Sequence, residues 1–229
     1  MTEALQRPDA ILFDLDGTLL DTAADIALAL SRAFADHGHP APDVAGVRLM
    51  IGRGAPLLVE RAVAALGLPL AAEEKAAVLE GFFHHYGRLQ AVDEVTAQPY
   101  DGVREALAAL HGAGLPMAVV TNKQQRFAEG LLRRLDLAAW VRLVVGGDTC
   151  ERRKPDPEPL LWACSQLGVL PGRALMVGDS VNDVQAARAA GMPVVCVPYG
   201  YNEGADPRTL PCDALVDTLA ELPRRLGLA

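Results

Sequence analysis

The sequence lacks an apolar run long enough to cross a membrane. Apolar stretches such as residues 117–120 and 194–197 are far shorter than the roughly 20 residues that a membrane-spanning helix requires. The first eight residues contain no basic segment followed by an apolar run, so we expect no signal peptide. These absences predict a protein without a membrane partner.

Cysteine is scarce, and its four copies are widely spaced. They stand at positions 150, 164, 196 and 212, without the close pairs that zinc sites show. Cys164 and Cys196 lie in apolar sequence, which is typical of reduced thiols rather than of a disulfide framework. We therefore expect a cytoplasmic protein.

Positive charge and aromatic residues are also in short supply. Lysine and arginine number 21 against 29 acidic residues, which gives a formal net charge of -8 and a pI near 5.1. Nucleic acids and anionic membranes carry the same sign of charge, so neither is an expected partner. Aromatic residues make up only 5% of the chain and offer little surface for stacking nucleobases. An anionic ligand must therefore be bound locally, by a metal ion and a few cations.

What the sequence does contain is a series of short apolar runs rich in branched residues. They occupy residues 10–13, 117–120, 143–145, 174–177 and 194–197. Segments with helical spacing lie between most of them, as in residues 101–114 and 180–190. This alternation predicts an α/β fold, a doubly wound parallel sheet with a Rossmann-like core and helices on both faces.

The stretch from about residue 22 to residue 89 differs, because its apolar positions keep helical spacing and no strand pattern interrupts them. Glycine and proline divide it into several helices at residues 38–42, 52–56 and 67–69. We interpret it as a mobile helical cap inserted after the first strand. The expected division is a catalytic core of residues 1–19 and 93–229 and a helical cap of residues 20–92.

Polar residues of a particular kind follow the predicted strands where they end. Asp14 and Asp16 follow the first strand, Thr121 and Asn122 follow the second, and Asp179 follows the strand at 174–177. An Asp-Gly pair at one strand end is usually only a turn. Because the carboxyl ends of parallel strands meet at one edge, several such groups predict one ligand-binding crevice.

At this point the sequence resembles the haloacid dehalogenase-like hydrolase superfamily, over essentially its whole length. Four motifs carry the resemblance: residues 14–19 (DLDGTL), Thr121, Lys154 before Pro-Asp-Pro, and residues 178–180 (GDS) with Asp183. Residues 51–54 and 199–203 are similar to segments of bacterial phosphoglycolate phosphatases, which narrows the resemblance to that branch. The resemblance implies a magnesium ion held by Asp14, the main-chain carbonyl of Asp16 and Asp179, with Asp183 in support.

The residue types make chemical sense for phosphate transfer. A carboxylate nucleophile, Asp14, splits a very slow hydrolysis into two easier transfers, and Asp16 is free to act as general acid and then as general base. The second aspartate argues against dehalogenase chemistry, because dehalogenases of the family lack it. Lys154 would neutralise the charge of phosphate and nucleophile, and Thr121 and Asn122 are candidates for binding substrate.

Plainer interpretations of these residues remain open at this stage. Thr121 could be the N-cap of the following helix, Lys154 an ordinary solvated lysine, and Asp183 an acidic residue placed for the helix dipole. Arg53, between two glycines, could reach over the site and pair with a substrate carboxylate, or could be a surface arginine.

The function that we predict is magnesium-dependent hydrolysis of a small phosphorylated metabolite through phospho-Asp14, with 2-phosphoglycolate as the first choice of substrate. A sugar-phosphate phosphatase or a phosphomutase on the same scaffold is the alternative, and the motifs do not separate them. A noncatalytic phosphometabolite-binding module should have lost one of the motif residues, and none is missing. The sequence leaves the oligomeric state open between monomer and homodimer.

Overall fold

A parallel sheet of six strands is the central element of residues 5–92 and 94–228, the part of the chain that the computed structural model describes. In spatial order the strands are β5 (Leu143–Val145), β4 (Met117–Val120), β1 (Ala10–Phe13), β6 (Ala174–Gly178), β7 (Val194–Cys196) and β8 (Ala214–Leu215). Ile11 lies opposite both Met117 and Leu175, so β1 is placed between β4 and β6. The strand order runs outward from β1 in both directions, which confirms the predicted doubly wound α/β fold.

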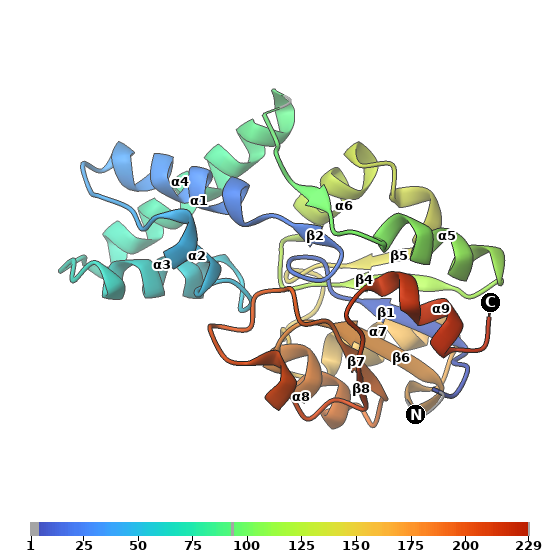
Figure 1. The fold of residues 1–229 in the computed structure, drawn as a ribbon. Helices are drawn as coiled ribbons and strands as arrows, with labels where there is room; N and C mark the ends of the chain where they lie inside the picture. Colours follow the sequence, from blue (N-terminus) through green and yellow to red (C-terminus); the bar gives the residue numbers. More distant parts are fainter. Residues whose placement is uncertain (1–4, 93, 229) are drawn as a thin grey trace.

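Helices cover both faces of this sheet because successive side chains of a strand point to opposite faces (Figure 1). Ile11 and Phe13 belong to one apolar cluster, with α5 (Val103–Gly112), α6 (Gln125–Arg134) and α9 (Leu222–Arg225). Leu12 belongs to the cluster of the other face, with α7 (Glu158–Leu167) and α8 (Val181–Ala189). β1 is fully buried, which explains its uninterrupted apolar sequence. None of the helices in the described ranges has the length and apolarity needed to cross a membrane.

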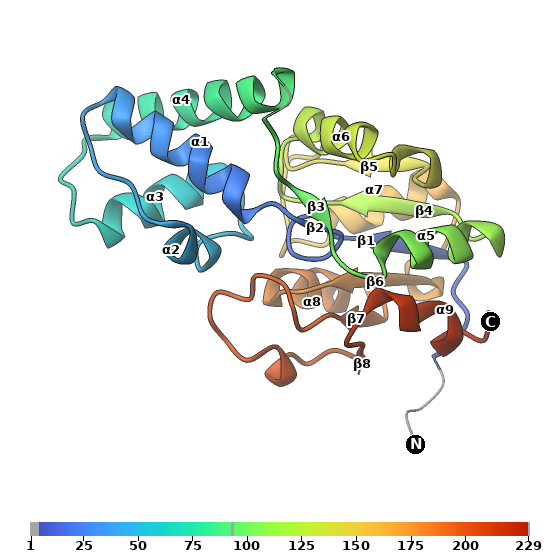
Figure 2. The same cartoon turned by 45° about the horizontal axis from the view of Figure 1, so that its top comes forward.

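Four further helices lie together beside the sheet, as Figure 2 shows. We call residues 23–91 the helical segment; it contains α1 (Ala23–Asp36), α2 (Val44–Arg48), α3 (Ala55–Ala65) and α4 (Ala72–Ala91). It has an apolar cluster of its own, which includes Leu30, Val59 and Phe82. The division into a core of residues 1–19 and 93–229 and a helical cap of residues 20–92 stays a prediction. Residues 1–4, 93 and 229 lie outside the described part of the chain.

The two ends of the helical segment are joined by contacts that the sequence did not indicate. β2 (Leu20–Asp21) and β3 (Gln98–Pro99) form a small antiparallel pair, too short to leave a periodic pattern. Next to it, the buried Asp25 carboxylate accepts hydrogen bonds from the N–H of Thr96 (2.8 Å), the Thr96 hydroxyl (2.7 Å) and the N–H of Ala97 (3.0 Å). Asp25 thus holds the start of α1 against the chain that returns to the sheet.

Replacing Asp25 should therefore destabilise the fold. In Asp25→Ala, the buried N–H of Ala97 loses its acceptor, as do the N–H and hydroxyl of the exposed Thr96, so we expect a loss of about 1–3 kcal/mol in the free energy of unfolding. Urea denaturation of wild type and variant measures it. Asp36→Ala, an exposed position on the same helix that pairs only with His85, is the control and should change stability little. A loss below about 1 kcal/mol for Asp25→Ala would contradict the assignment.

Candidate active site

The polar residues predicted from the strand ends gather at the carboxyl edge of the sheet. Asp14 follows β1, Thr121 follows β4 and Asp179 follows β6, and these strands are parallel neighbours. A cavity of about 60 Å³ opens there. Among the predicted residues, its lining includes Asp14, Asp16, Thr121 and Asn122. Lys154, Asp179 and Asp183 are at least 97% buried beside it.

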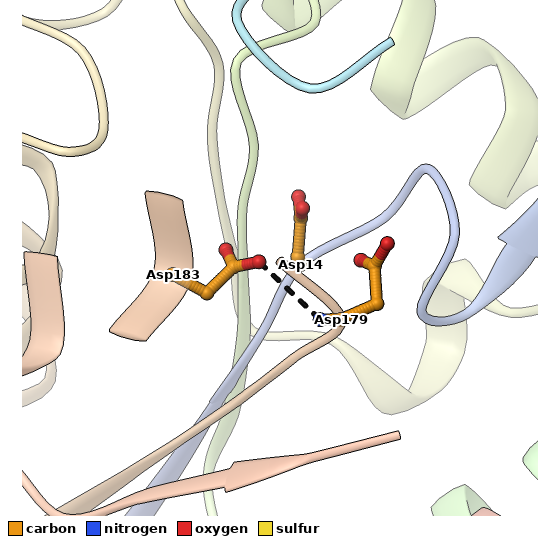
Figure 3. Close-up of side chains that lie close together, drawn as sticks. All are labelled: Asp14, Asp179 and Asp183. Atoms are coloured by element: carbon orange, nitrogen blue, oxygen red, sulfur yellow. Dashed lines mark hydrogen bonds between the residues drawn. The ribbon is translucent and has the colours of Figure 1, made fainter. Parts of the chain in front are cut away.

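Three buried carboxylates form a cluster at the floor of the site. Asp14, Asp179 and Asp183 each offer one oxygen atom, and these atoms lie within 4.8 Å of one another. Figure 3 shows that the three side chains come from three places in the chain and converge. Several hard oxygen atoms at this spacing are the ligand type that magnesium prefers.

The charge of this cluster is not balanced by the protein. Lys154 is the cation in contact with it, with Nζ 3.0 Å from Asp14 Oδ1 and 2.6 Å from Asp183 Oδ1. Burial raises the pKa of Asp14 to about 7; Lys154 lowers that pKa, and Asp183 and Asp16 raise it further. Burial, followed by Asp183 and Asp14, also raises the pKa of Asp179. One ammonium cannot offset three carboxylates, so the donor set fits a divalent cation.

Asp179 is fixed in place by two hydrogen bonds that the sequence did not predict. The Thr18 hydroxyl donates to Oδ1 at 2.7 Å, and the main-chain N–H of Tyr201 donates to Oδ2 at 2.6 Å. Gly17 and Gly200 pack so closely on this carboxylate that a Cβ atom at either position would collide with it, and Gly17 has a φ of +91°. The loop at residues 199–203, whose role the sequence left open, is therefore part of the support of the cluster.

Asp183 lies both at the start of a helix and in the carboxylate cluster, and its role at a metal site stays a prediction. It lies in the first turn of α8, where its Oδ2 accepts the N–H (3.1 Å) and the hydroxyl (2.7 Å) of Ser180. Its other oxygen accepts the hydrogen bond from Lys154. Asp183 thus stabilises the start of α8, as the helix-terminal interpretation predicts. Its carboxylate also belongs to the cluster.

Asp16 is bound separately from the other three aspartates. Its carboxylate accepts hydrogen bonds from Lys123 Nζ at 2.8 and 2.9 Å and from the Thr22 hydroxyl at 2.6 Å. Burial acts to lower the pKa of Lys123, but Asp16 outweighs it and the pKa is raised. Sequence reasoning missed Lys123. Its place directly after Thr121 and Asn122, in the same strand-exit loop, was the available signal.

Thr121 and Asn122 connect neighbouring loops. The Thr121 hydroxyl accepts the N–H of Lys123 at 3.2 Å, whereas α6 has Gln124 as its N-cap, so Thr121 does not cap that helix. Asn122 Nδ2 donates to the main-chain oxygens of Gly52 and Lys154, at 2.9 Å each. This side chain ties the loop before α3 to the sheet edge.

Arg53 lies near the cavity without lining it. Its Nε donates to Asn182 Oδ1 at 3.0 Å and lies 3.9 Å from Glu203 Oε1. Its neighbours Gly52 and Gly54 do line the cavity, and so does Arg153, which the sequence reasoning missed. The substrate-binding role of Arg53 stays a prediction.

The helical segment gives the cavity an apolar wall. The apolar and aromatic residues that line it are Ile26, Ile51, Leu58, Phe82, Phe83 and Tyr86, with Phe127 from α6. A charged floor opposite an apolar wall is the arrangement of a small-molecule site, with few polar groups to orient the ligand.

Comparison with known proteins agrees with this geometry. The model of the haloacid dehalogenase-like hydrolase family matches residues 8–191. A phosphoglycolate phosphatase of Thiobacillus denitrificans is 44% identical over 93% of this chain and 92% of its own length. An N-acetylmuramic acid 6-phosphate phosphatase of Pseudomonas aeruginosa is 43% identical over 96% of this chain and 93% of its own.

Solved structures show the same fold. The crystal structure of a predicted phosphoglycolate phosphatase from Haemophilus somnus superposes with a TM-score of 0.89, at 32% identity, and covers 96% of this chain and 98% of the other. The resemblance to the phosphoglycolate phosphatase-like branch is thereby confirmed. The chain belongs to the haloacid dehalogenase-like hydrolase family.

Proposed function

We propose that this protein is a magnesium-dependent phosphatase that hydrolyses 2-phosphoglycolate to glycolate and phosphate. The observation that carries the proposal is the position of Asp14: it ends β1, lines the cavity and belongs to a carboxylate cluster that lacks balancing charge. A carboxylate there is rigidly aimed at a ligand in the cavity.

The donor set supports magnesium, held by Asp14, the main-chain carbonyl of Asp16, Asp179 and Asp183. When bound, the ion offsets the repulsion between Asp14 and a phosphate dianion, which is roughly 4 kcal/mol per pair of unit charges at 4 Å in an effective dielectric of about 20. Lys154 adds a second positive charge beside Asp14 and holds Asp183 in place.

The reaction proceeds in two transfers. Asp14 attacks phosphorus in line, the ester P–O bond breaks, and Asp16, which must take up a proton before this step, gives that proton to the departing glycolate oxygen. Asp16 then accepts a proton from water as that water attacks phospho-Asp14, which releases phosphate and restores Asp14. The hydrogen bonds from Lys123 and Thr22 keep the Asp16 carboxylate at the cavity lining for both proton transfers.

The charged side chains at the cavity suit a small anionic substrate: Lys123 and Arg153 line it, and Arg53 lies beside it. The phosphoglycolate phosphatase relative, at 44% identity over almost the whole chain, supports the same choice. The Thr121 hydroxyl and the main-chain N–H of Asn122 bind the phosphoryl group, because the Asn122 side chain is engaged with Gly52 and Lys154, and Arg53 turns from Glu203 to the substrate carboxylate.

Hydrolysis of a sugar phosphate is the second candidate. Its support is the aromatic wall of Phe82, Phe83, Tyr86 and Phe127, together with the relative that acts on N-acetylmuramic acid 6-phosphate. A sugar would require the helical segment to move away from the sheet edge. Transfer of the phosphoryl group to a second substrate hydroxyl, as in a phosphomutase, uses the same residues.

We also propose that residues 20–92 act as a cap over residues 1–19 and 93–229. The contacts across the site support this division: Asn122 binds the main-chain oxygen of Gly52, and Arg61 Nη2 lies 2.8 Å from Glu203 Oε1. Closure of such a cap excludes water from the first transfer. The free cysteines fit a cytoplasmic enzyme, acting as a monomer or homodimer.

The proposed nucleophile is tested with a panel of small phosphomonoesters, with and without magnesium. Wild type should release phosphate only with magnesium and fastest from 2-phosphoglycolate, and Asp14→Asn should lose at least 1,000-fold in kcat because an amide is not a nucleophile. Activity of Asp14→Asn close to wild type would overturn the mechanism. Equal rates across the panel would overturn only the substrate.

Magnesium binding is tested apart from catalysis. Because magnesium offsets charge in the folded cluster, millimolar magnesium should raise the melting temperature of wild type by about 5 °C. Asp179→Asn, which removes one carboxylate, should lose most of that increase, whereas Asp36→Asn, on the exposed face of α1, should keep it. The same increase in all three proteins would show that the cluster is not the binding site.

The role of Arg53 is tested with Arg53→Ala. Loss of a charge-assisted hydrogen bond to the substrate carboxylate should raise KM for 2-phosphoglycolate roughly tenfold. Ethyl phosphate, which has a methyl group where phosphoglycolate has its carboxylate, should be hydrolysed by variant and wild type alike. Unchanged kcat and KM for phosphoglycolate would leave Arg53 as a residue that only pairs with Asn182 and Glu203.

A further inference from the structure

Tyr86 carries a buried hydroxyl whose proton has no acceptor among the described residues; Lys123, the polar group beside it, is a donor. The residue lies on α4 and is 2% exposed, and its Oη has no hydrogen-bond partner among the described residues. Leaving a polar group unpaired away from water costs free energy, so such groups are rare unless a ligand or water completes them. Phenylalanine at this position would avoid the cost.

The side chain faces the active-site cavity and is held there. Tyr86 lines the cavity together with Asp14 and Asp16. Its ring packs edge-on against Phe127, with the ring centroids 5.1 Å apart, and against Phe82 at 5.7 Å. These contacts fix the ring at the cavity wall, where a ligand in the cavity can reach its hydroxyl.

A second donor lies beside it. Lys123 Nζ lies 4.8 Å from the centroid of the Tyr86 ring and donates two hydrogen bonds to the Asp16 carboxylate. An ammonium has three N–H donors, so the third can reach the Tyr86 oxygen, which leaves the Tyr86 O–H to donate to another group. Burial raises the pKa of Tyr86 to about 12, although Lys123 lowers it, so the hydroxyl keeps its proton near neutral pH.

We propose that Tyr86 is a specificity-determining residue, whose hydroxyl donates a hydrogen bond to the carboxylate of the substrate's leaving group. This inference rests on the proposed phosphoglycolate phosphatase function. With phosphorus at Asp14, the carboxylate of phosphoglycolate extends toward the wall formed by the helical segment. The neighbouring lining residues Ile51, Leu58 and Phe83 are apolar, so Tyr86 is the hydrogen-bond donor within this part of the lining, and Arg53, outside the lining, is the second group proposed for the same carboxylate.

The test compares Tyr86→Phe with wild type on 2-phosphoglycolate and on ethyl phosphate. The variant should lose roughly 10- to 100-fold in kcat/KM for phosphoglycolate, mainly through KM, and keep the wild-type value for ethyl phosphate, which has no acceptor there. Its melting temperature should be unchanged or higher, because the substitution removes an unpaired hydroxyl and keeps the ring. A structural role would instead lower the melting temperature and both activities together.

Tyr100→Phe is the matched control. The Tyr100 hydroxyl is also buried without a partner, but the residue does not line the active-site cavity, so this variant should keep the kinetics of wild type. If Tyr86→Phe keeps the preference of wild type for phosphoglycolate, or loses both substrates equally, the assignment of Tyr86 is overturned and the proposed function stands. If wild type itself shows no preference for phosphoglycolate over ethyl phosphate, the proposed substrate fails, and the assignment fails with it.

Discussion

The crowding of buried carboxylates at the ends of β1 and β6 is the constraint on which the rest of the site depends. Asp14, Asp179 and Asp183 are buried within reach of one cation, and Lys154 is the positively charged side chain that contacts them among the described residues. Burial of like charges this close is unfavourable, as the raised pKa values of Asp14 and Asp179 show. A divalent cation bound at the cluster would offset this repulsion. The proposed ion would therefore link the stability of the fold to catalysis.

The two aspartates of the first motif, Asp14 and Asp16, lie in different environments, and each contacts a different lysine. Lys154 binds Asp14 from the loop after β5, whereas Lys123 binds Asp16 from the loop after β4. Aspartates two positions apart in the chain thus acquire different partners. Such separation is how two carboxylates in one site take different roles, one as nucleophile and the other as acid and base.

The loop at residues 199–203 joins the carboxylate cluster to the helical segment. The main-chain N–H of Tyr201 binds Asp179, while its hydroxyl accepts the N–H groups of Thr22 and Ala23 at the start of α1. Its ring is buried in the apolar cluster of the helical segment. Two residues further on, Glu203 pairs with Arg61 of α3. A displacement of the helical segment is therefore transmitted to a proposed metal ligand through one residue.

The sequence by itself indicated the doubly wound parallel α/β fold and, for strands that are neighbours, the gathering of Asp14, Thr121 and Asp179 at one edge, because the carboxyl ends of adjacent parallel strands meet there; the structure decided the spatial order of the strands. It also indicated separate helices between residues 22 and 89. Only the tertiary structure decided that Lys123 pairs with Asp16, that Tyr201 supports Asp179, and that the Tyr86 hydroxyl faces the cavity unpaired. Periodicity fixes the face of an element on which a side chain lies. The packing of the helical segment against the sheet edge decides which distant element contacts that face. No local pattern in the sequence indicates this packing.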